Sequence, residues 1–230
     1  MIAEEIVKLE NVTKKLGRRL TLEDINFEVK EGEKVCILGP KKSGKTALVE
    51  IILGILKPDA GSVSVLGTDP YTNSSPLLGQ ASVYYEKNSF PLHWRAKQVI
   101  NFKKQLWGEE NSQHIFAALD ISNMKNTTVE KLSEEERAKL NLFFALTEKA
   151  KLIILDDPWA NSLNFDLENI IKNFPHTSFI ITSKTPEPVY DIADKIYILH
   201  EGKIKKSIAK QDYSSLEKLK SLYSQYAPED

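Results

Sequence analysis

The sequence has few of the residues that cross-link small secreted domains or span membranes. Its 230 residues include one cysteine, Cys36, so no internal disulfide can form, which is compatible with a reducing compartment. No apolar run approaches the roughly 20 residues that cross a bilayer, and the start, MIAEEIVKLE, lacks the basic and apolar regions of a signal peptide. We therefore expect no direct membrane insertion, so any membrane role requires a partner.

An excess of either charge is also missing. The chain has 31 Lys and Arg against 32 Asp and Glu, which indicates neither a nucleic-acid-binding surface nor an acidic tail. The 4 histidines show no metal-ligand spacing, and no nucleophile triad is visible. A hydrophobic content of 41% over this length suits one globular domain with a sizeable core. We expect no nucleic-acid partner.

Short apolar runs separated by glycine and charged turns dominate the first third of the chain. They predict strands over residues 5–15, 20–30, 33–39 and 61–67. From Lys45 the apolar positions change to a helical spacing, which predicts a helix that ends before the next proline. The residues that set this spacing are Leu48, Ile51, Ile52 and Ile55. A helix should therefore follow the third strand directly.

Helical and strand patterns mix in the rest of the chain. Residues 94–120 resemble a small helical insertion, and a helix should run from Ser133 to about Glu148. Further strands are predicted over residues 151–157, 178–183, 195–200 and 202–208, and further helices over 167–174, 189–194 and about 213–226. Strands that alternate with helices predict an α/β fold with a mainly parallel sheet covered on both faces.

The stretch GPKKSGKT, residues 39–46, matches the phosphate-loop pattern G-x-x-x-x-G-K-[ST] and lies between a predicted strand and a predicted helix. Its glycines let the backbone close around phosphate oxygens, and Lys45 can reach the β- and γ-phosphates. The predicted nucleotide-binding residues are Gly39, Pro40, Lys41, Lys42, Ser43, Gly44, Lys45 and Thr46. The alternative is a vestigial loop that no longer binds, and for Lys41 and Lys42 solvated charge is the simpler interpretation.

A second stretch, LIILDD at residues 152–157, is an apolar strand that ends in acids. Asp156 can hold Mg²⁺ through water, and the Thr46 hydroxyl of the phosphate loop can ligate the same ion. Many strands end in Asp, but its distance downstream of the phosphate loop makes the assignment strong. We therefore predict a magnesium site formed by Thr46 and Asp156.

With the phosphate loop, LSEEER at residues 132–137 and LIILDDP at 152–158 in this order, the chain resembles the nucleotide-binding domain of ATP-binding cassette (ABC) transporters over nearly its whole length. The resemblance implies a P-loop NTPase-type sheet with an N-terminal antiparallel β subdomain. It also implies a small helical subdomain at about residues 87–147, within a single domain of residues 1–230.

The same resemblance implies ATP and Mg²⁺ as cofactors. It also implies a transmembrane permease subunit as partner, and a second, intact nucleotide-binding subunit is a possible further one. The expected location is cytoplasmic, at the inner face of the membrane and held there through the permease.

Several positions depart from the family pattern. Asp157 takes the place of the catalytic glutamate that orients water, and Glu86 and Lys184 fall at the γ-phosphate-sensing glutamine and the switch histidine. Leu16 stands where an aromatic ring usually stacks on adenine, and Asn164 at the aspartate of the D-loop. Asp157 is one methylene short, and a misplacement of about 1 Å in a positioning group costs on the order of 100-fold in rate. We therefore expect nucleotide binding with weak or no hydrolysis.

Two other functions stay open at this point. One is an active ATPase subunit that powers export by using Asp157 together with the Lys184 cation. The other is an interaction protein outside transport that keeps the fold as a nucleotide-responsive scaffold. Turnover by the purified protein separates the first from a subunit that only binds ATP, and co-purification with a membrane subunit separates the second.

LSEEER carries Glu134 and Glu135 where the family signature has glycines that bind the partner's γ-phosphate. A glutamate about 6 Å from a phosphate charge is repelled by about 3 kcal/mol at an effective dielectric of 20. The simpler interpretation of the acids is a capping box between Ser133 and Glu136 at a helix start. The alternative is a charge swap with basic residues across a dimer. Either way, the usual closed ATP sandwich should be disfavoured.

Three large aromatic residues mark the helical insertion. They are Phe90, Trp94 and Trp107. The family uses this region to contact transmembrane subunits, but we expect local core packing rather than a contact surface for these side chains.

Overall fold

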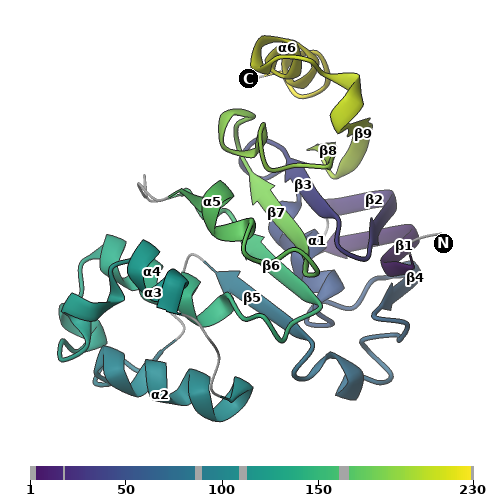
Figure 1. The fold of residues 1–230 in the computed structure, drawn as a ribbon. Helices are drawn as coiled ribbons and strands as arrows, with labels where there is room; N and C mark the ends of the chain where they lie inside the picture. Colours follow the sequence, from purple (N-terminus) through teal and green to yellow (C-terminus); the bar gives the residue numbers. More distant parts are fainter. Residues whose placement is uncertain (1–3, 18, 86–89, 109–112, 161–165, 229–230) are drawn as a thin grey trace.

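A computed structural model describes residues 4–17, 19–85, 90–108, 113–160 and 166–228 (Figure 1). Two residues with predicted roles, Glu86 and Asn164, lie outside the described residues. The strands fall into two sheets, one antiparallel and one mainly parallel.

The first sheet is antiparallel and has the order β2-β1-β4. Its strands are β1 (Glu5–Leu16), β2 (Arg19–Lys30) and β4 (Ala60–Val65). Long β1 is central and pairs antiparallel with both neighbours. The predicted N-terminal β subdomain is therefore confirmed as part of the fold.

The second sheet has the order β5-β6-β7-β3-β8-β9. Its strands are β3 (Lys34–Leu38), β5 (Ala81–Tyr85), β6 (Leu152–Asp156), β7 (Ser178–Ser183), β8 (Lys195–His200) and β9 (Lys203–Ala209). All neighbours pair in parallel except β8 and β9, which are antiparallel. The predicted mainly parallel sheet is confirmed, although β5 was not predicted.

Helix α1 (Lys45–Ile52) lies between the two sheets and contacts strands of both. Alternate residues of β3 point to opposite faces, so Val35 and Ile37 join the core around α1, whereas Cys36 and Leu38 join the core on the other face. Cys36 is fully buried there, as expected of a structural thiol. Both faces of the parallel sheet are therefore covered.

The remaining α-helices are α2 (Ala96–Trp107), α3 (Gln113–Ala118), α4 (Glu134–Ala145), α5 (Leu167–Ile171) and α6 (Leu216–Tyr226). Helices α2, α3 and α4 gather in one group on the β5 side of the sheet (Figure 1). Trp107 is buried in this group, and Phe90 and Trp94 pack against the same core, which confirms the prediction of local packing. No helix of the described part is long and apolar enough for a membrane crossing.

The short 3₁₀ turns of the described residues are η1 (Ser75–Leu77), η2 (Ile121–Met124), η3 (Val129–Lys131), η4 (Glu187–Val189) and η5 (Lys210–Asp212).

The prediction of a helix over residues 189–194 is wrong. After η4 the chain turns and reaches Asp194, whose carboxylate and backbone N–H pair with Lys34 of β3. This anchor fixes the chain at residue 194 and leaves few residues for an α-helix between η4 and β8.

Candidate functional site

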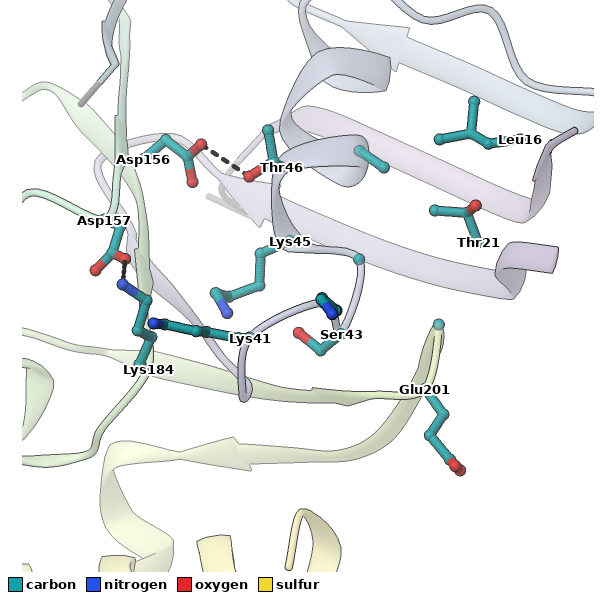
Figure 2. A pocket seen from close by; sticks show the side chains of 14 residues that line it. Leu16, Thr21, Lys41, Ser43, Lys45, Thr46, Asp156, Asp157, Lys184 and Glu201 are labelled. Atoms are coloured by element: carbon teal, nitrogen blue, oxygen red, sulfur yellow. Dashed lines mark hydrogen bonds and ion pairs between the residues drawn. The ribbon is translucent and has the colours of Figure 1, made fainter. Parts of the chain in front are cut away.

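The carboxyl ends of three neighbouring strands meet at one edge of the parallel sheet. The loop of residues 39–44 follows β3, Asp156 ends β6 and Asp157 follows it, and Lys184 follows β7. These residues line a cleft of about 770 Å³ (Figure 2), except that Gly39 and Pro40 are not among its lining residues. Ligands of open α/β sheets bind at this edge, so the cleft is the candidate site.

The loop after β3 has the backbone of a phosphate cradle. A Cβ atom at Gly39 would come within 2.2 Å of the Leu199 carbonyl oxygen, and Gly44 has φ +112, so both positions need glycine. The Ser43 hydroxyl is buried without a hydrogen-bond partner. A donor held unpaired inside a loop at a helix N-terminus is what a phosphate oxygen would satisfy.

Lys45 lies at the centre of the cradle and is largely buried. Its Nζ donates hydrogen bonds to the carbonyl oxygens of Gly39, at 2.5 Å, and Pro40, at 2.9 Å. Burial lowers the pKa of Lys45 to about 8, while the nearby carboxylates of Asp157 and Asp156 act in the opposite direction. The ammonium is therefore held by loop carbonyls in a buried place, where an incoming anion would stabilise its charge.

Two oxygen donors that suit Mg²⁺ lie side by side. The Thr46 hydroxyl donates to Oδ2 of Asp156 at 3.1 Å, and the Thr182 hydroxyl donates to Oδ1 at 2.7 Å (Figure 2 shows the first). Carboxylate and hydroxyl oxygens are ligands that Mg²⁺ accepts, usually together with water and phosphate. The residues present therefore fit a Mg²⁺ ion that accompanies a phosphate ligand.

Lys184 forms an ion pair with Asp157 across the cleft (Figure 2). The Asp157 side chain is 16% exposed and that of Lys184 is 35% exposed, so water screens this pair only in part. Asp157 has φ +51, and its backbone N–H donates to the Thr182 hydroxyl at 2.8 Å. The carboxylate that sequence reasoning placed at the water-orienting position is therefore bonded to a cation instead.

The opposite end of the cleft is formed by Leu16, Thr21, Glu201 and Gly202. Leu16 is 48% exposed, and in Figure 2 the Glu201 side chain points away from the phosphate loop. Among the described residues that line the cleft, none carries an aromatic ring. A nucleoside base has no stacking partner from these residues, as the substitution at Leu16 predicts.

The acids of LSEEER form the predicted capping box. The Glu136 backbone N–H donates to Ser133 Oγ at 3.2 Å, and the Ser133 N–H donates to the Glu136 carboxylate at 2.8 Å. Glu135 pairs with Lys139 of the next turn at 2.6 Å, and Glu134 is exposed. The start of α4 therefore pairs the backbone N–H groups of Ser133 and Glu136 within itself, and none of these residues lines the cleft.

Residues 22–160, more than half of the chain, match the family model described as ABC transporter. The chain belongs to the ABC transporter family. The P-loop NTPase-type fold agrees with this membership.

Two curated relatives and one solved structure illustrate the membership. An uncharacterized ABC transporter ATP-binding protein, YdbJ of Bacillus subtilis, is 28% identical over 91% of this chain and 71% of its own length. The Fe(3+) ions import ATP-binding protein FbpC of Escherichia coli K12 is 24% identical over 92% of this chain and 64% of its own. A structure titled as the ATP binding subunit of an ABC transporter superposes with a TM-score of 0.82 at 17% identity, covering 95% of this chain and 99% of that one.

Sequence reasoning missed Thr182 and Ser183 of β7. Thr182 bonds the Asp156 carboxylate and the Asp157 backbone N–H, and the Ser183 carbonyl accepts from the Gly39 N–H at 3.1 Å. The only signal in the sequence is that polar residues end an apolar strand, at the same edge where Asp156 ends its neighbour. Strand order was needed to see that these two ends are adjacent.

The lowered pKa of Lys45 predicts that nucleotide affinity falls as pH rises from 7.5 to 9. Phosphate favours the charged ammonium, so nucleotide binding raises the pKa of Lys45. Above about pH 8, where the Lys45 side chain of the ligand-free protein is mostly neutral, binding therefore takes up a proton. The expected loss approaches about tenfold per pH unit at the upper end. Calorimetry in two buffers of different ionisation enthalpy measures the uptake. The Lys45→Arg variant keeps its charge and should show a flat profile; an equal slope in both proteins would contradict the assignment.

Proposed function

We propose that this chain is the ATP-binding subunit of an ABC transporter that binds Mg-ATP with weak or no hydrolysis and serves a regulatory or structural role. The observation that carries the proposal is the ion pair between Lys184 and Asp157, at the edge of a cleft with a full phosphate loop. Binding requires the loop and its helix, which are in place. Hydrolysis also requires a carboxylate that is free to orient water.

For binding, we propose that the loop of residues 39–46 holds the phosphates. The backbone N–H groups and the Ser43 hydroxyl would face phosphate oxygens, and Lys45 would exchange its loop carbonyls for the β- and γ-phosphates. Thr46 and Asp156 would hold Mg²⁺, which neutralises phosphate charge when bound. Mg-ADP should bind by the same contacts.

For hydrolysis, we propose that Asp157 is a weak substitute for the water-orienting group. Its carboxylate is short and already accepts a charge-assisted bond from Lys184, so a water molecule has to compete with an ammonium group for it. Lys184 also places a cation near the phosphate end, where it favours a bound triphosphate. We assign Glu86 to the third altered catalytic position by its place in the sequence, since it lies outside the described residues.

For organisation, we propose one nucleotide-binding domain over residues 1–230, with its helical subdomain at about 87–147. A permease subunit would hold it at the cytoplasmic face of the membrane, and a second, intact nucleotide-binding subunit would complete the transporter. The relatives named above support this, since both are ATP-binding proteins of transporters. Co-purification with a membrane subunit is the test, and a chain that never associates with one would fit a scaffold outside transport.

The purified chain should turn over ATP far more slowly than the several per second that are typical of enzymes. Asp157→Glu alone should not restore turnover, because Lys184 can pair with the new carboxylate as well. Asp157→Glu combined with Lys184→His should raise the rate more than the two single changes together. Phosphate release from each variant measures this. Wild-type turnover of several per second would instead support an active ATPase that uses the Lys184 cation.

A further inference from the structure

Helix α6 is bonded directly to the residue that pairs with Asp157. The Tyr223 hydroxyl donates a hydrogen bond to the backbone carbonyl oxygen of Lys184 at 2.9 Å. Tyr223 is 8% exposed, and Leu219, one turn earlier, is fully buried, so this face of α6 packs against the sheet. Figure 1 shows α6 beside the loop that follows β7. Helix α6 is therefore linked to the cleft through Lys184, although none of the residues that line the cleft belongs to α6.

The turn that carries Lys184 has further anchors on its other sides. The Ser183 carbonyl accepts from the Gly39 N–H of the phosphate loop at 3.1 Å. The Ser183 hydroxyl bonds the backbone of Thr185, donating to its carbonyl at 2.9 Å. The side chain of Lys184 completes the set through its ion pair with Asp157. The phosphate loop, Asp157 after β6, and α6 are thus all bonded to residues 183–185.

The other links between α6 and this region are weaker. Lys220 pairs with Glu187 at 2.7 Å, but both side chains are about half exposed, and exposed pairs contribute little. Ser215 caps the first turn of α6 by accepting from the Lys218 N–H at 3.2 Å, and this bond lies within α6. Among the described residues, the Tyr223 hydroxyl therefore provides a buried and direct connection to Lys184.

We propose that Tyr223 is a positioning residue for Lys184, so that α6 controls the cation at the phosphate end of the cleft. A lysine side chain is flexible, and its reach toward Asp157 or a phosphate depends on where its backbone is held. Tyr223 holds that backbone by its carbonyl. The proposal rests on the proposed function in one respect, namely that a nucleoside triphosphate is the ligand that meets Lys184.

The test compares Tyr223→Phe with Tyr213→Phe. Tyr213 is the matched control, because its buried hydroxyl also donates to backbone carbonyls, those of Ala193 at 3.3 Å and Tyr190 at 3.5 Å, rather than to that of Lys184. Tyr223→Phe should reduce the preference for ATP over ADP by about threefold to tenfold, the range expected for one hydrogen bond. Tyr213→Phe should leave it unchanged. In a Lys184→Met background, Tyr223→Phe should have no further effect. Calorimetry with both nucleotides measures all of these.

A second measurement needs no nucleotide. Backbone hydrogen exchange over residues 183–187 should be several-fold faster in Tyr223→Phe and unchanged in Tyr213→Phe, because only the first change releases the Lys184 carbonyl. Equal exchange in wild type and Tyr223→Phe would overturn the proposal, as would an effect of Tyr223→Phe on ATP preference that persists without Lys184. If the wild type binds no nucleotide, the proposed function fails, while the exchange result still decides whether Tyr223 holds Lys184.

Discussion

Lys45→Ala is expected to abolish binding of Mg-ATP and Mg-ADP. Charge-assisted hydrogen bonds are worth about 1.5–3 kcal/mol each, so the loss of two such bonds to phosphate should weaken binding by more than about 100-fold. The Lys45 ammonium is already largely buried in the protein without ligand. Removing it from water therefore adds little to the free-energy cost of binding nucleotide. Calorimetry with nucleotide at up to millimolar concentration is the measurement.

The control for this change is Lys57→Ala, which removes an exposed lysine after α1 that does not line the cleft. It should bind nucleotide as the wild type does. Thermal melting of both variants is needed as well, because Lys45 also bonds two carbonyls of its own loop. A wild type that binds no nucleotide would indicate a vestigial loop. Retained binding by a folded Lys45→Ala variant would remove Lys45 from the site.

The second large effect concerns Glu134 and Glu135. Replacing both with glycine should raise ATP-dependent association by about 100-fold, because it removes roughly 3 kcal/mol of repulsion toward a partner's phosphate. The capping box between Ser133 and Glu136 supports this change, since it involves neither of the replaced residues and caps α4 without them. Sedimentation of wild type and variant, each with and without Mg-ATP, measures the association.

Glu134→Gln combined with Glu135→Gln is the matched control, because it removes the charges but keeps the helical propensity that glycine lowers. It should also increase ATP-dependent association. If the acids instead pair with basic residues across a dimer, the wild type will already dimerise without nucleotide, and both double variants will weaken that dimer. Dimerisation of the wild type that depends on ATP would contradict both interpretations.

Most strands of the parallel sheet were predictable because each has a recognisable apolar pattern in its own residues. Leu152–Asp156 and Ser178–Ser183 are short apolar runs with polar ends, and both form buried strands. Ala81–Tyr85 was missed although valine and tyrosine favour strands, and its parallel pairing with β6 shows that it is one. The helix prediction over residues 189–194 was wrong. The local pattern favours a helix, but the hydrogen bonds between Asp194 and Lys34 of β3 hold the chain in another conformation.

By itself, the sequence determined the phosphate loop, its flanking strand and helix, and the capping box at Ser133, because each depends on residues within a few positions of one another. Only the tertiary structure decided that Lys184 pairs with Asp157 and that Tyr223 holds the Lys184 backbone. These partners are far apart in the chain and belong to different elements. They meet because β6, β7 and β3 are neighbours in the sheet and α6 packs beside the end of β7. No local pattern encodes that order, since it results from how the whole chain buries its apolar faces.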